Sequence, residues 1–193
     1  MTAMELMKDP AYKSPELAKL LEERGPVPSL DATTDIHALR ETLRQRKLEL
    51  PAAGGATASD IDETDHSIPT RDGTNITVRI RRGSKSNEGP FNGVAVNVDY
   101  RLAPEIKFPI LVYDCFDAVR WTAAHAGVHR GDLTKGFIVA GISAGANMAC
   151  TASHLARDEK LQPPLTGVYL SIPSLLSQAS VPDRFKEEYL AQE

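Results

Sequence analysis

The sequence predicts an α/β protein, in which apolar strands are joined by amphipathic helices. A short apolar run at residues 136–140 reads as a buried strand, and the apolar positions after Ala144 recur at helical spacing. A further apolar run at residues 165–172 has the composition of another strand. Strand, helix and strand in this order indicate an α/β fold class.

The composition is that of one soluble globular domain. Of the 193 residues, 41% are hydrophobic and 25% are charged, and the net charge of −4 gives no reason to expect nucleic acid as a partner. No apolar run is long enough to span a bilayer, and the first ten residues lack the apolar core of a secretory signal. No cofactor or metal is expected, and the oligomeric state is left open.

The two cysteines bear on the location of the protein. Cys115 and Cys150 both fall in helical patterns, where buried free thiols are expected rather than a disulfide. Free thiols fit a reducing, cytoplasmic compartment. A peroxisomal location is the alternative if a lost C-terminal tail carried the signal, because residues 191–193 are not a peroxisomal address.

The N-terminal half contains four further expected elements. Helices are predicted at residues 14–24 and from about 34 to 48. A linker at residues 51–56 follows, and residues 62–68 and 75–82 read as two strands around a turn. The alternation of apolar and polar residues in the second strand predicts that one face of this hairpin is exposed.

The pattern G-x-S-x-G occurs at residues 141–145. By chance it should appear in about one chain in fifteen of this length, so its context decides its weight. An apolar strand before it and a helix after it are the setting of a nucleophile elbow, in which the serine hydroxyl stands clear of the backbone. We therefore predict Ser143 as a catalytic nucleophile and the backbone N–H of Ala144 as an oxyanion donor. Gly141 and Gly145 are expected to leave room for close approach of strand and helix.

Residues 98–105, V-D-Y-R-L-A-P-E, carry a family resemblance. Together with G-I-S-A-G-A-N-M-A about forty residues later, they resemble the hormone-sensitive-lipase-like carboxylesterases, a branch of the α/β hydrolases. The resemblance implies an incomplete α/β hydrolase core at residues 60–193, with a mostly parallel sheet flanked by helices. The helices of residues 1–50 would cap the active site, or else simply pack against the core.

The resemblance also implies a reaction. Members of this branch hydrolyse small esters through an acyl-serine intermediate, so the expected substrate is a small ester, lactone or acyl-thioester. The overall similarity is to fungal members, which implies a role in a secondary-metabolite or toxin pathway.

The same resemblance indicates that an internal segment is missing. The family has a further strand, an H-G-G-G loop with additional oxyanion donors and a helix where this sequence has only residues 83–92. Ten residues are also short for a crossover between parallel strands. The family's sheet order places the missing strand between the strands at 93–98 and 137–141, which must then pair directly or leave open edges.

No complete catalytic triad is expected from this sequence. A serine needs an imidazole to take its proton and a carboxylate to orient that imidazole, in the order Ser, Asp or Glu, His. Only His154 follows Ser143, and it lies about 16 Å further along the same helix. Asp183 comes too early to be the family acid. We expect no imidazole within about 3.2 Å of the Ser143 hydroxyl. The remaining histidines all precede the serine: His37, His66, His125 and His129.

Three interpretations therefore stay open. The chain is a shortened serine carboxylesterase, or a non-catalytic ligand- or partner-binding descendant, or a fragment without a stable fold. The second class has a precedent within the branch, because the plant gibberellin receptors resemble these esterases and lack a working triad. Hydrolysis that depends on Ser143 separates the first from the second, and cooperative unfolding argues against the third.

Overall fold

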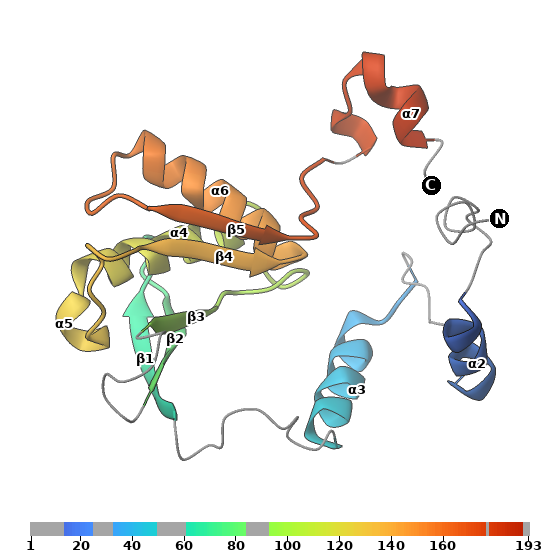
Figure 1. Ribbon diagram of the computed structural model, residues 1–193, viewed down its shortest axis with the longest axis horizontal. Coiled ribbons are helices and arrows are strands. Elements are labelled where there is room, and N and C mark those ends of the chain that lie inside the picture. Colours follow the sequence, from blue (N-terminus) through green and yellow to red (C-terminus); the bar gives the residue numbers. More distant parts are fainter. Residues whose placement is uncertain (1–13, 25–32, 50–60, 84–92, 177, 191–193) are drawn as a thin grey trace. The chain divides into compact units, whose positions relative to one another are not determined.

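The computed structural model describes residues 14–24, 33–49, 61–83, 93–176 and 178–190. The chain divides into two compact units, Met1–Gly55 and Ala56–Glu193, and each is treated by itself below (Figure 1). No helix within the described ranges has the length and apolar character needed to cross a membrane.

The smaller unit contains helices α2 (Pro15–Arg24) and α3 (Ile36–Glu49), so the two predicted N-terminal helices are confirmed. The Leu17 N–H donates to Ser14 Oγ at 3.1 Å, and Asp35 Oδ1 accepts two backbone N–H bonds at the start of α3, so both helices have N-caps. Leucines on both helices are exposed: Leu17, Leu20 and Leu43. The role of these helices as a cap stays a prediction, and the linker at 51–56 lies outside the described residues.

The larger unit begins with an antiparallel sheet of order β1-β2-β3. Strands β1 (Ile61–Pro69) and β2 (Asn75–Gly83) form the predicted hairpin. Strand β3 (Val94–Asp99) pairs antiparallel with β2, so the parallel crossover assumed between these strands was wrong. Antiparallel neighbours can be joined by a short connection, which removes the objection that ten residues are too few.

A second sheet holds the motif. Strands β4 (Ile138–Ile142) and β5 (Gly167–Ser171) pair in parallel, and helix α6 (Ala144–Asp158) joins them. The remaining elements of this unit are α4 (Ile110–Ala124), α5 (Ala126–His129), two 3-10 turns (Gln178–Ser180 and Asp183–Phe185) and α7 (Lys186–Leu190). The α/β class is confirmed, but the expected single sheet consists of two separate sheets in the described residues.

Helix α4 packs against the antiparallel sheet and against helix α6 of the larger unit (Figure 1). One of its faces contributes Ala118 to a cluster with Ile68, Ile76 and Val78 of the antiparallel sheet. Its other face places Phe116 against Ala152 and Ala156 of α6. A third cluster joins the same two helices through Val112, Cys115 and Met148. The core is thus held mainly by one helix that contacts the antiparallel sheet and the motif helix.

Two buried carboxylates on α4 bind neighbouring loops. Asp114 accepts from the Arg101 guanidinium at 2.6 and 2.8 Å, and Asp117 accepts from Arg71 at 2.8 and 3.0 Å. Arg101 also pairs with Asp72 in the turn between β1 and β2 at 2.8 Å. Charge-assisted bidentate pairs of this kind fix loop position more strongly than neutral hydrogen bonds.

Candidate active site

Ser143 lies in the turn between the last residue of β4 and the first residue of α6, as predicted. Its backbone has φ 53° and ψ −118°, a conformation rarely adopted by a residue with a side chain. Such a residue carries about 1–3 kcal/mol of strain, which the surrounding structure has to offset. The Ser143 N–H donates to the Ser171 carbonyl on β5 at 2.9 Å, which ties the turn to the parallel sheet.

The two motif glycines differ in their surroundings. A Cβ at Gly141 would lie 2.1 Å from the Gly145 carbonyl oxygen, so the close approach of strand and helix requires glycine there. A Cβ at Gly145 would meet nothing within 4 Å, so the expected steric need for glycine at this second position was wrong. The elbow depends on Gly141.

The first turn of α6 provides backbone donors beside Ser143. The N–H groups of Ala146 and Asn147 donate to the Ser143 carbonyl at 3.0 and 3.1 Å. The N–H of Ala144 precedes the first such bond, as expected for the opening residues of a helix. Ser143 and Ala144 are both exposed, so a ligand can approach the hydroxyl and this donor. The oxyanion role of Ala144 stays a prediction.

Three of the four imidazoles described in the larger unit form hydrogen bonds elsewhere, and the fourth, that of His154, lies on α6 eleven residues beyond Ser143. His125 Nδ1 bonds the Trp121 carbonyl at 2.8 Å, and its ring stacks on the Trp121 ring at 4.8 Å between centroids. His129, which is 1% exposed, bonds the Thr122 carbonyl through Nε2 and accepts the Gly131 N–H at Nδ1. His66 Nε2 lies 3.3 Å from Thr64 Oγ1. The hydrogen bonds of these three rings therefore serve local structure.

The carboxylates show the same pattern. Asp114 and Asp117 are bound to arginines, and Asp183 is almost fully exposed and pairs with Lys186. Among the described residues, no hydrogen bond joins a carboxylate to an imidazole and none joins an imidazole to Ser143 Oγ. No cluster of three or more metal-ligating side chains occurs in the described ranges either. The described residues therefore include a nucleophile elbow, but no imidazole among them is hydrogen-bonded to its serine.

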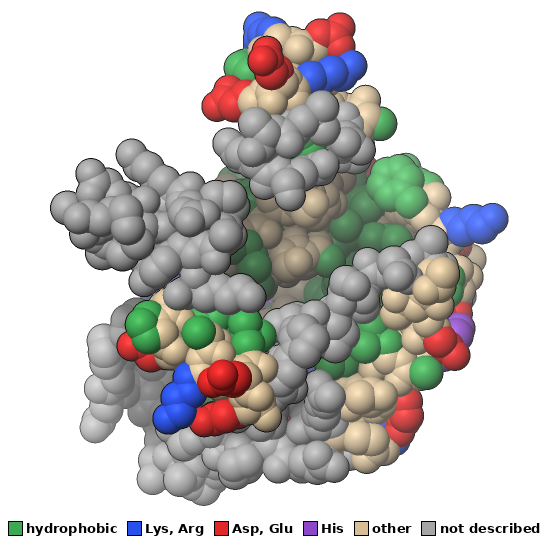
Figure 2. Space-filling view, turned by 90° about the vertical axis from the view of Figure 1, so that its right-hand side faces the viewer, with side chains coloured by type: hydrophobic (Ala, Val, Ile, Leu, Met, Phe, Trp, Pro, Cys, Tyr) green, Lys and Arg blue, Asp and Glu red, His purple; other side chains and the backbone are tan. Residues whose placement is uncertain are grey.

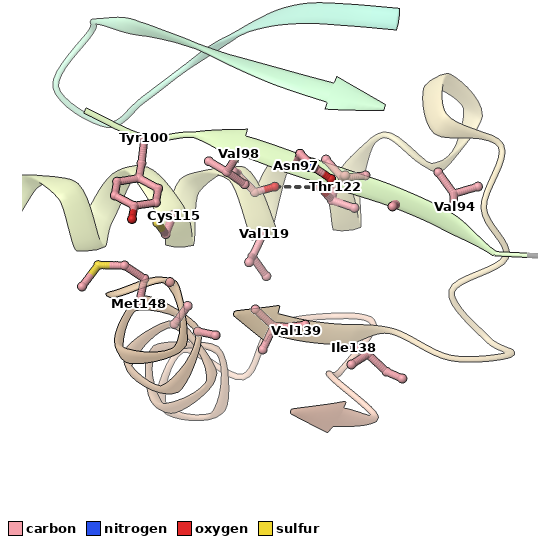
Figure 3. Close-up of a pocket in the computed structure, with 17 residues that line it drawn as sticks. Val94, Asn97, Val98, Tyr100, Cys115, Val119, Thr122, Ile138, Val139 and Met148 are labelled. Carbon is pink, nitrogen blue, oxygen red and sulfur yellow. Dashed lines mark hydrogen bonds between the residues drawn. The ribbon is translucent and has the colours of Figure 1, made fainter. Parts of the chain in front are cut away.

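A cavity of about 550 Å³ lies beside the elbow (Figure 3). Strands β3 and β4 form two of its walls, and helices α4 and α6 form the others; Gly145 of the motif is one of the lining residues. Sequence reasoning missed this cavity, because its aliphatic side chains have the pattern of an ordinary core. The only signal was the expectation that the strands at 93–98 and 137–141 lack a neighbour.

The surface of the larger unit carries exposed hydrophobic side chains, as Figure 2 shows for one face. Ile142, directly before Ser143, is 66% exposed, and Ile172, directly after β5, is 75% exposed. Leu175 and Leu176 are also more than half exposed, in a segment held by the Asn147 side chain through the Ser174 carbonyl. The surroundings of the serine are therefore apolar.

Comparison with known proteins gives the family. A family model described as "alpha/beta hydrolase fold" matches residues 90–193, which is more than half of the chain. An AB hydrolase superfamily protein of Schizosaccharomyces pombe is 31% identical, with 92% of this chain and 60% of the relative covered. A versiconal hemiacetal acetate esterase of Dothistroma septosporum is 34% identical over 52% of this chain and 30% of its own length.

A solved structure of a vibralactone cyclase has a TM-score of 0.72 at 26% identity, and covers 90% of this chain and 61% of its own. This chain thus spans about 60% or less of the length of these proteins. The alignment with the S. pombe protein runs over 208 positions but uses 92% of 193 residues, about 178, so about 30 positions have no counterpart here. With the elbow and this match together, the chain belongs to the α/β hydrolase fold family.

Proposed function

We propose that the protein carries serine carboxylesterase chemistry, with Ser143 as nucleophile and the Ala144 N–H as an oxyanion donor. The observation that carries the proposal is the backbone of Ser143, which is held at φ 53° between a parallel strand and a helix N-terminus. Strain of this kind persists where the surrounding structure enforces it, and it clusters at catalytic positions.

The chemical step follows from this geometry. Ser143 Oγ attacks the ester carbonyl carbon, the C=O π electrons move to oxygen, and the Ala144 N–H donates to the resulting oxyanion. Collapse expels the alcohol and leaves an acyl-serine, which water then hydrolyses. The serine proton has to pass to a base, and none of the imidazoles engaged in local bonds is available for this transfer. We therefore expect the chain as it stands to react slowly, with water as the proton acceptor.

The proposed substrate is a small uncharged ester, lactone or acyl-thioester. The exposed apolar residues around Ser143, Ile142 above all, favour an uncharged ligand. Two similar proteins are named as a versiconal hemiacetal acetate esterase and a vibralactone cyclase, which supports this substrate class. We also propose a role in a secondary-metabolite or toxin pathway. A cytoplasmic location is proposed because the two cysteines are free thiols, which fit a reducing compartment.

Hydrolysis of p-nitrophenyl acetate tests this function. We expect slow turnover that is lost, by tenfold or more, in Ser143→Ala. Ser153→Ala is the matched control, because Ser153 lies on the same helix and its hydroxyl bonds only the Cys150 carbonyl. Equal rates in the wild type and Ser143→Ala would show that the hydrolysis does not use the elbow.

A second candidate is a ligand-binding descendant of the esterases. The observation in its favour is that three imidazoles of the larger unit, those of His66, His125 and His129, bond to residues other than Ser143. Saturable binding of an ester with no turnover, weakened by Ser143→Trp at the elbow, supports this alternative over catalysis.

A further inference from the structure

The cavity beside the elbow runs along the edges of two strands. Its lining includes the consecutive residues 94–98 of β3 and 138–140 of β4. Successive side chains of a strand point to opposite faces of the sheet, so a cavity that touches every residue in a run lies along the strand's edge. In the described residues β3 pairs only with β2 and β4 only with β5, so the edge that each turns to the cavity is unpaired.

The two open edges run in the same direction. In Figure 3, β3 runs from Val94 toward Tyr100 in the same sense as β4 runs from Ile138 to Val139, and Val119 lies between the two strands. One extended strand placed between these edges would pair with both and would join the two sheets into one. The five lining residues of β3 correspond to about 16 Å of strand, so the occupant has about five residues.

The residues that line the cavity indicate the chemistry of a molecule that could occupy it. None of the lining side chains is charged, and most are aliphatic. Burial raises the pKa of the Tyr100 hydroxyl, which therefore stays neutral at physiological pH. A charged strand would lose its hydration here without gaining a partner, which is costly. An alkyl chain would fill the volume but would leave two rows of backbone N–H and C=O groups without partners.

We propose that this cavity, the β3–β4 groove, binds an uncharged, extended strand supplied by another polypeptide. The S. pombe relative has about 30 aligned positions that this chain lacks, which is chain enough for one strand and its connections. A partner strand would therefore supply in trans what this chain does not hold. The proposal does not rest on esterase chemistry at Ser143.

Hydrogen exchange with a synthetic peptide tests the proposal on the full chain. The probe is a seven-residue peptide of alternating valine and threonine between two terminal lysines that stay outside the groove. We expect it to slow amide exchange by tenfold or more in β3 and in β4 together, and to leave the outer edges of β1 and β5 unchanged. A peptide with prolines in place of the threonines lacks the N–H donors along one of its two edges, so it cannot pair with both strands and should not protect β3 and β4 together.

A variant with a large side chain inside the groove, compared with a control variant outside it, provides a second test. Val119→Trp places a large side chain into the cavity from α4, whereas Val128→Trp changes an exposed residue on α5. We expect at least tenfold weaker peptide binding in the first variant and unchanged binding in the second. If Val119→Trp fails to fold, as judged by circular dichroism, the two-strand protection pattern in the wild type decides alone.

Several results would overturn the proposal. These are protection limited to the outer edges of β1 or β5, equal protection by the proline peptide, or equal protection by decanoate, which would make the cavity a lipid site. Full protection of both strands in the protein alone would show that its own chain fills the groove if it persists on dilution. If it is lost on dilution, a second copy fills the groove, which equally contradicts a separate partner.

Discussion

The two glycines of the motif make a direct test of the elbow, because their environments are opposite. We expect Gly141→Ala to lower the free energy of unfolding by about 3 kcal/mol, since the new methyl group meets the Gly145 backbone. In Gly145→Ala the new methyl group has no neighbouring atom within 4 Å, and alanine has the higher helix propensity. This substitution should raise the free energy of unfolding by up to about 1 kcal/mol. Urea denaturation of the two variants measures both effects, and equal midpoints would contradict the geometry of the turn.

Cys115 and Cys150 should differ in reactivity. Burial in the α4–α6 core, with the Asp114 carboxylate nearby, raises the pKa of the Cys115 thiol to about 12. The native thiol therefore stays protonated at pH 8 and should not react with a disulfide reagent, whereas the partly exposed Cys150 should react within minutes. A thiol titration should count one group in the native protein and two in urea; two fast groups in the native protein would contradict the burial of Cys115.

The pKa of the Cys115 thiol is higher in the folded protein than in the unfolded chain. The free energy of unfolding should therefore fall as pH rises. Stability is fully present below the unfolded thiol pKa of about 8.5 and is lost as pH rises toward 12. Cys115→Ala should remove this part of the alkaline loss, although it also leaves a small cavity. The difference in slope between the two stability profiles above pH 9 measures the effect.

Protonation of the Asp72 carboxyl, in the β1–β2 turn, should lower the stability of the protein in acid. Hydrogen bonds from Thr70 Oγ, the Thr74 N–H and Arg101 hold the pKa of its carboxyl well below the usual range. A depressed carboxyl pKa contributes stability that is present above about pH 4 and is lost as pH falls through the folded value. Asp72→Asn should flatten the stability profile below pH 4, and an unchanged profile would contradict the role of this carboxylate.

Helix α4 is the element on which the larger unit depends. Asp114 is fully buried and accepts from both the side chain and the backbone N–H of Arg101. Asp114→Asn removes the buried carboxylate and leaves the Arg101 guanidinium paired only with the more exposed Asp72, so it should destabilise by about 3 kcal/mol. Asp65→Asn is the control, because the Asp65–Arg79 pair is exposed and such pairs contribute about 0–1 kcal/mol. Similar losses in the two variants would contradict the special role of α4.

The elements themselves were predictable because their signals are local. The hairpin was indicated by its turn at residues 71–74, and the elbow by five residues between a strand and a helix. The pairing of β3 with β2 could not be predicted in the same way. The partner of a strand depends on contacts that are distant in sequence, and the residues of the strand itself do not indicate it. The steric difference between Gly141 and Gly145 was hidden for the same reason, since it depends on how two elements approach each other.

For the molecule as a whole, the division into two sheets is the main departure from expectation. The resemblance allowed either direct pairing of the strands at 93–98 and 137–141 or open edges, and the described residues have open edges. The aliphatic lining of the resulting cavity reads as core in the sequence, so the cavity appears only in three dimensions. The sequence thus predicted the position of the serine in the candidate site, but it did not predict the cavity beside that serine.

Labelling with a fluorophosphonate probe tests whether Ser143 is a nucleophile in an elbow that has no base among the described residues. The chain is incubated with the probe, and intact mass and peptide mapping give the rate and the site. We expect slow labelling that is confined to Ser143, lost in Ser143→Ala and retained in Ser153→Ala. Rapid stoichiometric labelling of Ser143 would reveal a base that activates it, and labelling at another serine would contradict its role as the nucleophile.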